Sequence, residues 1–126
     1  EEAKQPAIDT QALGDAFFVV AGAAITELVK MVSQTRGTEV RRDELEPFTW
    51  ALADRFAARG PSALATARDV FAASARAYLA ATAGYDAILT PVLARVPWRI
   101  GHLSPLVPAD ELLARTADAV GYTPIH

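Results

Sequence analysis

Hydrophobic positions recur at steps of three and four residues along the first part of the chain, which is the spacing of one face of an α-helix. Over residues 10–33 there are two such rows. The first comprises Leu13, Phe17, Val20, Ala24 and Leu28, and the second comprises Phe18, Ala21, Ile25, Val29 and Val32. Because polar residues gather only at its ends, this helix is expected to be buried on most sides. Gly22 and the alanines beside it leave room for a close-packed neighbour.

Two further helices are expected over residues 44–59 and 62–82. Pro47 suits the first turn of the earlier one, where its missing N–H would have no partner in any case. Gly60 is expected to end that helix, and Ser62 is expected to cap the next one with its hydroxyl group. The two helices should therefore be joined by a tight turn.

A short apolar run after the third helix is expected to form a strand near residues 87–90. A lone strand leaves its backbone N–H and C=O groups without partners, so it requires pairing from elsewhere. Residues 91–108 contain four prolines and are expected to form an irregular loop before a last helix over 109–120. The predicted fold of residues 1–126 is therefore a single partial domain, mainly α-helical, with about four helices and one strand.

Composition places the chain among globular proteins. It is 52% hydrophobic and 21% charged, with a net charge of −3 and a pI near 5.3, so neither nucleic acid nor an anionic membrane is predicted as a partner. The chain has no cysteine, which excludes disulfides, thiolate nucleophiles and cysteine zinc sites.

No membrane span or secretory signal is predicted. The unbroken apolar run Ala16–Ile25 is shorter than the roughly 20 residues that cross a bilayer. The acidic residues Glu1 and Glu2 stand before it where a signal peptide has basic ones. A cytoplasmic location is therefore expected. The chain lacks an initiator methionine and starts and stops abruptly, so we expect it to be a piece of a longer protein.

Candidate chemistry is sparse. His102 lies in the proline-rich loop near Trp98. In a functional role it would be a general base or a substrate contact. The alternative is a solvent-exposed loop histidine. Trp98 is either an interaction residue or an ordinary loop residue. The second histidine, His126, is terminal and too far away to form a helix-spaced metal pair, so no metal site is predicted.

Three short motifs follow one another in order along the chain. They are Leu45-Glu46-Pro47-Phe48-Thr49, Tyr85-Asp86-Ala87-Ile88-Leu89-Thr90-Pro91 and Tyr122-Thr123-Pro124. In order and spacing they resemble the later part of an enzyme of the amidase signature family, and the resemblance covers most of the 126 residues. It implies a segment of an α/β fold whose central mixed sheet the strand at 87–90 joins.

In that family a serine attacks the amide carbonyl, and a second serine in a cis peptide passes the proton to a neutral lysine. A Gly/Ser-rich loop donates backbone N–H groups to the oxyanion. These residues lie N-terminal to the region covered here, and this chain has no Ser-Ser pair and no Gly/Ser-rich loop. No catalytic residue carries over, no metal or organic cofactor is implied, and the chain alone is predicted to be inactive.

By resemblance, the chain is a non-catalytic scaffold and substrate-side segment of a hydrolase or acyl transferase acting on carboxamides. Its partner is then the remainder of the amidase chain. The expected substrate-side elements are the loop after Pro91, with Trp98 and His102 as candidates, and the end of the first helix. The alternative is a stand-alone helical interaction domain that forms a homodimer. The two readings differ in their expected surface. A fragment should leave apolar surface bare on the first helix and at 87–90, which would favour self-association or domain swapping, whereas a genuine small domain should have an ordinary surface.

Overall fold

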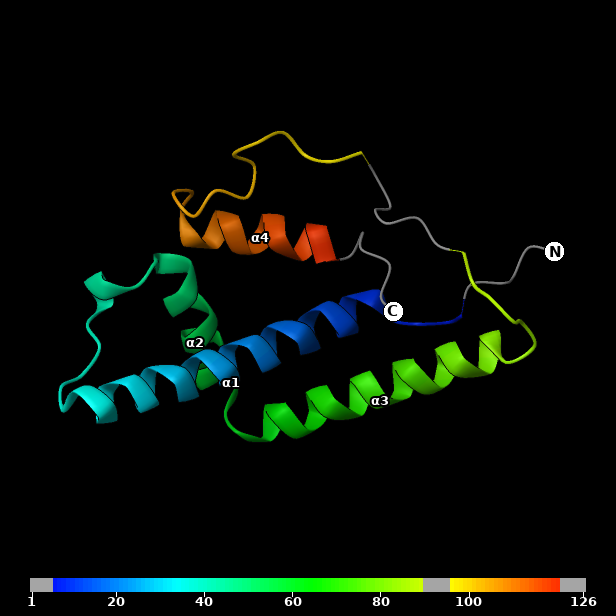
Figure 1. Ribbon diagram of the computed structural model, residues 1–126, viewed down its shortest axis with the longest axis horizontal. Helices are drawn as coiled ribbons and strands as arrows, with labels where there is room; N and C mark the ends of the chain where they lie inside the picture. Colours follow the sequence, from blue (N-terminus) through cyan, green and yellow to red (C-terminus); the bar gives the residue numbers. More distant parts are fainter. Residues whose placement is uncertain (1–5, 90–95, 121–126) are drawn as a thin grey trace.

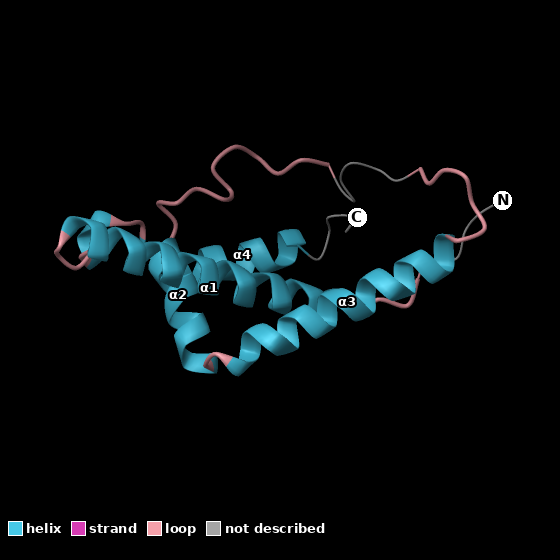
Figure 2. Ribbon diagram, turned by 60° about the horizontal axis from the view of Figure 1, so that its bottom comes forward, coloured by secondary structure: helices cyan, strands magenta, loops and turns pink. Residues whose placement is uncertain are grey.

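The computed structural model describes residues 6–89 and 96–120, with the side chains of the last helix described as far as Thr116. In the described part, all of the regular secondary structure is helical, and no strand is present (Figures 1 and 2). Its elements are α1 (Thr10–Arg36), the 3₁₀ helix η1 (Arg42–Glu44), α2 (Pro47–Arg59), α3 (Ser62–Thr82) and α4 (Ala109–Val120). The prediction of a mainly α-helical chain with four helices is confirmed.

The ends of the helices follow local capping chemistry. A carboxylate oxygen of Asp9 accepts the N–H of Ala12 at 2.9 Å, which satisfies one of the free donors at the start of α1. The last helical residue of α1 is Arg36, three residues beyond the predicted end, and Gly37 caps it with a φ of 70°. The prediction that Ser62 caps α3 is wrong, because Pro61 occupies the capping position and Ser62 is already the first helical residue.

The second helix begins at Pro47, three residues later than predicted. The preceding residues Arg42–Glu44 form the tighter 3₁₀ turn η1, and Glu46 is extended, so the chain changes direction before α2 starts. Proline at the first helical position agrees with the expectation. The predicted bounds of α3 and α4 are confirmed.

The predicted strand is wrong for residues 87–89, and Thr90 lies outside the described residues. After α3 the chain makes a turn in which Tyr85 donates its N–H to the carbonyl oxygen of Thr82 at 3.1 Å. Ile88 and Leu89 then lie exposed, at 48% and 100%. A strand needs a neighbouring strand to satisfy its backbone groups, and the described chain supplies none.

Helix α1 is the central element. Helices α2 and α3 pack against it, and α4 lies against α2 and the flank of α1 (Figure 1). The best-buried cluster joins Ala16 and Val19 of α1 to Ala67 of α3. On the side facing α2, Gly22 is buried so closely that an added Cβ would stand 2.3 Å from the carbonyl oxygen of Leu52. The expectation that small residues at Gly22 admit a close neighbour is confirmed.

The expectation that α1 is buried on most sides is wrong. Leu13 of the first hydrophobic row is 2% exposed, but Phe17 and Leu28 are 51% and 55% exposed. Helix α2 packs on the side of Phe18 and Gly22, and α3 packs against Ala16 and Val19. Three neighbouring helices do not encircle a helix of 27 residues. One apolar side of α1 is therefore open to solvent.

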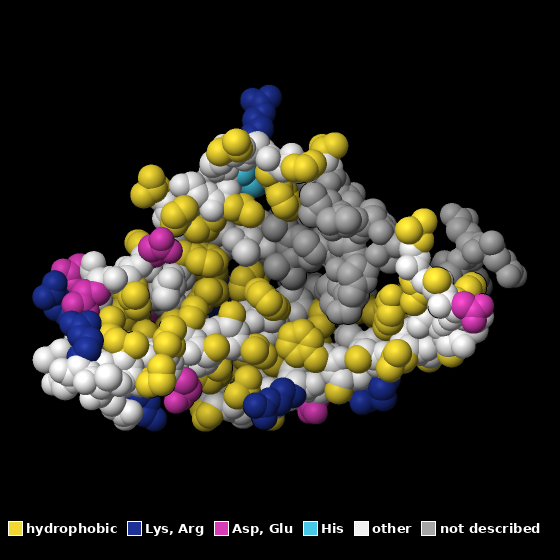
Figure 3. All heavy atoms as spheres, in the orientation of Figure 1, with side chains coloured by type: hydrophobic (Ala, Val, Ile, Leu, Met, Phe, Trp, Pro, Cys, Tyr) yellow, Lys and Arg dark blue, Asp and Glu magenta, His cyan; other side chains and the backbone are white. Residues whose placement is uncertain are grey.

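Several large hydrophobic side chains of the described residues are exposed. On α1 they include Phe17, Leu28 and Met31, and in the loop before α4 they include Val96, Ile100 and Leu106. Figure 3 shows hydrophobic side chains spread over this surface, along α1 and over the loop before α4. Such a surface is typical of a chain that packs against something else.

By length and composition, α1 also meets the criteria for a helix that crosses a membrane. The expectation of no membrane span used only the unbroken apolar run Ala16–Ile25, and the helix as a whole is apolar over a longer stretch. Of its most apolar stretch, 28% is buried inside the structure, and core helices of soluble proteins meet the same criteria. Length and composition thus leave both roles open for α1.

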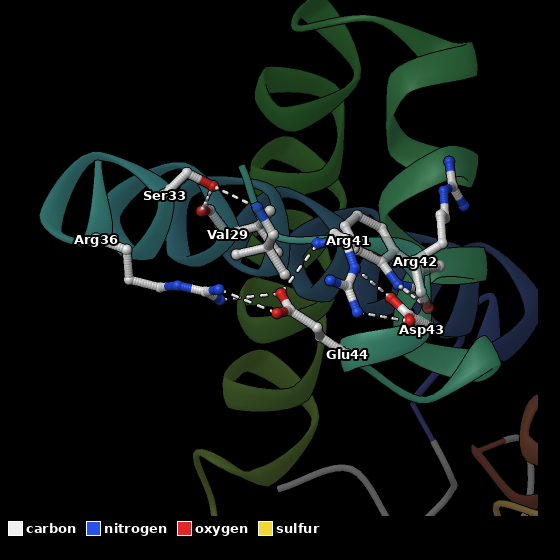
Figure 4. A network of polar contacts seen from close by, with 9 residues as sticks. Val29, Ser33, Arg36, Arg41, Arg42, Asp43 and Glu44 are labelled. Carbon is white, nitrogen blue, oxygen red and sulfur yellow. Dashed lines mark hydrogen bonds and ion pairs between the residues drawn. The ribbon is translucent and has the colours of Figure 1, made fainter. Parts of the chain in front are cut away.

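A network of charged side chains holds the turn between α1 and α2 (Figure 4). Glu44 accepts two hydrogen bonds from the guanidinium group of Arg36, at 2.9 and 3.0 Å, and a third from the backbone N–H of Arg41 at 3.0 Å. Arg42 pairs with Asp54 of α2 at 2.7 Å. These contacts tie the end of α1 to η1 and to α2.

Glu44 makes this network sensitive to acid. The hydrogen bonds from Arg36, and next the N–H of Arg41, lower the pKa of Glu44 from 4.5 to about 2. Because the folded pKa is depressed, the stabilisation is complete above pH 4.5 and is lost as pH falls through 2. We expect Glu44→Gln to lower the free energy of unfolding at pH 7, with the difference from wild type shrinking between pH 4.5 and 2.

Urea unfolding followed by circular dichroism, at several pH values for both proteins, checks this expectation. Because the network lies at the surface, the difference at pH 7 should also shrink in 1 M salt. A difference that stays constant from pH 7 to pH 2 would contradict the assigned role of Glu44.

Candidate functional site in the loop before α4

The loop leading to α4 is built from successive tight turns. The N–H groups of His102, Ser104 and Val107 each donate to the carbonyl oxygen three residues earlier, all at 3.1 Å. Gly101 has a φ of 93°, a conformation that side-chain-bearing residues rarely adopt, so the turn at this position favours glycine. The predicted irregular loop therefore has a defined local fold over its described residues.

These turns bring together the two residues that the sequence singled out. The rings of Trp98 and His102 stack, with centroids 5.7 Å apart and an interplanar angle of 6°. Both side chains are half-buried. The four-residue separation and the turn closed by the N–H of His102 place one ring over the other. Two separate sequence candidates thus form one aromatic platform.

Arg115 of α4 holds this platform in place. Its guanidinium group donates to the backbone carbonyl oxygen of His102 at 2.6 Å and also pairs with Glu111 one turn earlier in α4. Leu112, on the same turn, is 4% exposed and anchors α4 to the rest of the molecule. The loop is therefore positioned by a packed helix.

The same loop carries exposed aliphatic side chains. They are Val96 at 86%, Ile100 at 107%, Leu103 at 42% and Leu106 at 92%. Flat aromatic rings with aliphatic neighbours suit contact with an apolar or planar group. Ser104, the serine nearest in sequence to His102, uses its hydroxyl oxygen to accept the N–H of Leu106 at 3.3 Å. The arrangement provides a contact surface, and it contains no assembled nucleophile and base.

The family-motif residues lie in two separate places. Glu46 precedes α2, Pro47 is its first residue, and Thr49 lies in its first turn, while Leu45 is half-buried just before it. Tyr85, Asp86 and Leu89 are exposed beyond the end of α3. In Figure 1 the start of α2 and the end of α3 lie at opposite ends of the molecule. The remaining motif residues, Thr90, Pro91, Tyr122, Thr123 and Pro124, lie outside the described residues, as does His126.

Sequence reasoning missed the polar contacts between helices. Asp15 of α1 pairs with Arg55 of α2 at 2.6 Å, and Arg59 approaches the same carboxylate at 3.5 Å. The Arg55 guanidinium also lies 5.6 Å from the ring centroid of Phe18. No local pattern marks such pairs, because their members are some 40 residues apart. Within the described residues, no group of three or more histidine, aspartate or glutamate side chains is arranged to hold a metal ion.

Comparison with known proteins identified no relative of this chain. The chain matches no protein-family model, no curated protein and no solved structure.

Proposed function

We propose that this chain is a non-catalytic scaffold and substrate-side segment of an amidase signature hydrolase. The motifs at Leu45–Thr49, Tyr85–Pro91 and Tyr122–Pro124, in the order of that family, are the sequence support. The parent enzyme would cleave or transfer the acyl group of a carboxamide with a serine, a cis-peptide serine and a lysine supplied by another part of the chain.

The exposure of Leu89 is the single observation that carries the proposal. Its side chain is 100% exposed although it occupies an apolar position of the Tyr85–Pro91 motif. In the family this segment is a strand of the central sheet, where Leu89 would be buried. An apolar segment without a pairing strand is expected when the sheet belongs to the remainder of the enzyme.

On this proposal the loop before α4 borders the acyl-binding site. The stacked rings of Trp98 and His102, together with the exposed Ile100 and Leu106 of the same loop, would contact the apolar part of the acyl group. Arg115 would position the loop by holding the His102 carbonyl oxygen. The chain's own residues would therefore shape and orient the substrate, and they would leave bond cleavage to the serine and lysine.

The extended reading frame and an activity assay together test this proposal. We expect the upstream coding sequence to encode a lysine followed by a Gly/Ser-rich segment with a Ser-Ser pair. The protein from that longer frame should release ammonia from simple carboxamides, and should lose at least roughly 1,000-fold in kcat when its nucleophilic serine becomes alanine. The 126-residue chain assayed in parallel should show no serine-dependent hydrolysis.

Two results would contradict the proposal. One is an extended frame without the lysine and serine pair. The other is serine-dependent amide hydrolysis by the 126-residue chain itself, since none of its serines stands in a catalytic motif.

A second candidate function is a helical interaction domain that acts through α1. The observation that favours it is the exposed apolar side of α1, with Phe17 at 51%, Leu28 at 55% and Met31 at 56%. On this reading the motif order is a chance similarity, and the upstream frame lacks the serine and lysine elements.

A further inference from the structure

We draw no further inference here: the strongest candidate, the exposed apolar side of α1 that carries Phe17, Leu28 and Met31, is an unpartnered helix face, and nothing in the structure shows what covers it.

Discussion

Gly22→Ala is expected to destabilise the protein by roughly 2 kcal/mol, although alanine is the better helix former. In an open helix the change would gain about 1 kcal/mol. Here the new Cβ would stand 2.3 Å from the carbonyl oxygen of Leu52 and 2.8 Å from the Cβ of Phe56. The carbonyl belongs to the backbone of α2, so α2 must move away from α1. That displacement loses packing along the whole contact.

Urea unfolding of the wild type and of Gly22→Ala measures this loss. Gly84→Ala is the matched control, because an added Cβ there meets nothing within 4 Å and the residue does not have a positive φ. It should be neutral or should stabilise by up to about 1 kcal/mol, since alanine restricts the unfolded chain. Equal effects of the two substitutions would contradict the close approach of α1 and α2.

Phe18→Ala is expected to cost about 3–5 kcal/mol, the largest effect of any single truncation proposed for this chain. The Phe18 ring is 2% exposed, and the Arg55 guanidinium lies 5.6 Å from its centroid. Truncation leaves a cavity between α1 and α2 and also removes the surface on which Arg55 lies. Small domains are stable by only ~5–15 kcal/mol, so a large part of the stability is lost.

Phe17→Ala, one residue earlier in the same helix, is the control for this loss. Its ring is 51% exposed, so it should cost less than about 1 kcal/mol when measured on the monomer. Thermal and urea unfolding should both be run at the lowest practical protein concentration, because Phe17 lies on the exposed apolar side of α1, where self-association would add to its apparent effect. A larger loss for Phe17→Ala than for Phe18→Ala would reverse the assignment of the buried side of α1.

The contrast between Phe17 and Phe18 shows how far the sequence could predict this fold. Both residues lie in apolar rows with helical spacing, so periodicity identified the helix and left its orientation open. The buried side is the one that carries Gly22, where α2 approaches most closely. Choosing between two apolar faces requires the position of the neighbouring helices, and this depends on contacts such as Asp15 with Arg55 that join distant parts of the chain.

At the candidate site, too, the sequence identified the residues and the tertiary contacts decided how they lie. The sequence pointed to Trp98 and His102 separately, from residue type and from their place in a proline-rich loop. Their stacking follows from the turn at Gly101 and from Arg115, which reaches the loop from α4. The strand prediction at 87–89 failed because an apolar run indicates burial, whereas a strand also requires a partner for its backbone groups.

The sequence by itself determined the local elements: four helices, the glycine at position 60 that ends α2, and a loop that carries Trp98 and His102. These follow from side-chain period and backbone preference, which act within a few residues. Only the tertiary structure decided which side of α1 is buried, where Trp98 meets His102, and that Phe17, Val20, Ala24, Leu28 and Met31 remain exposed. Those outcomes depend on contacts between residues far apart in the chain, and no local pattern contains them.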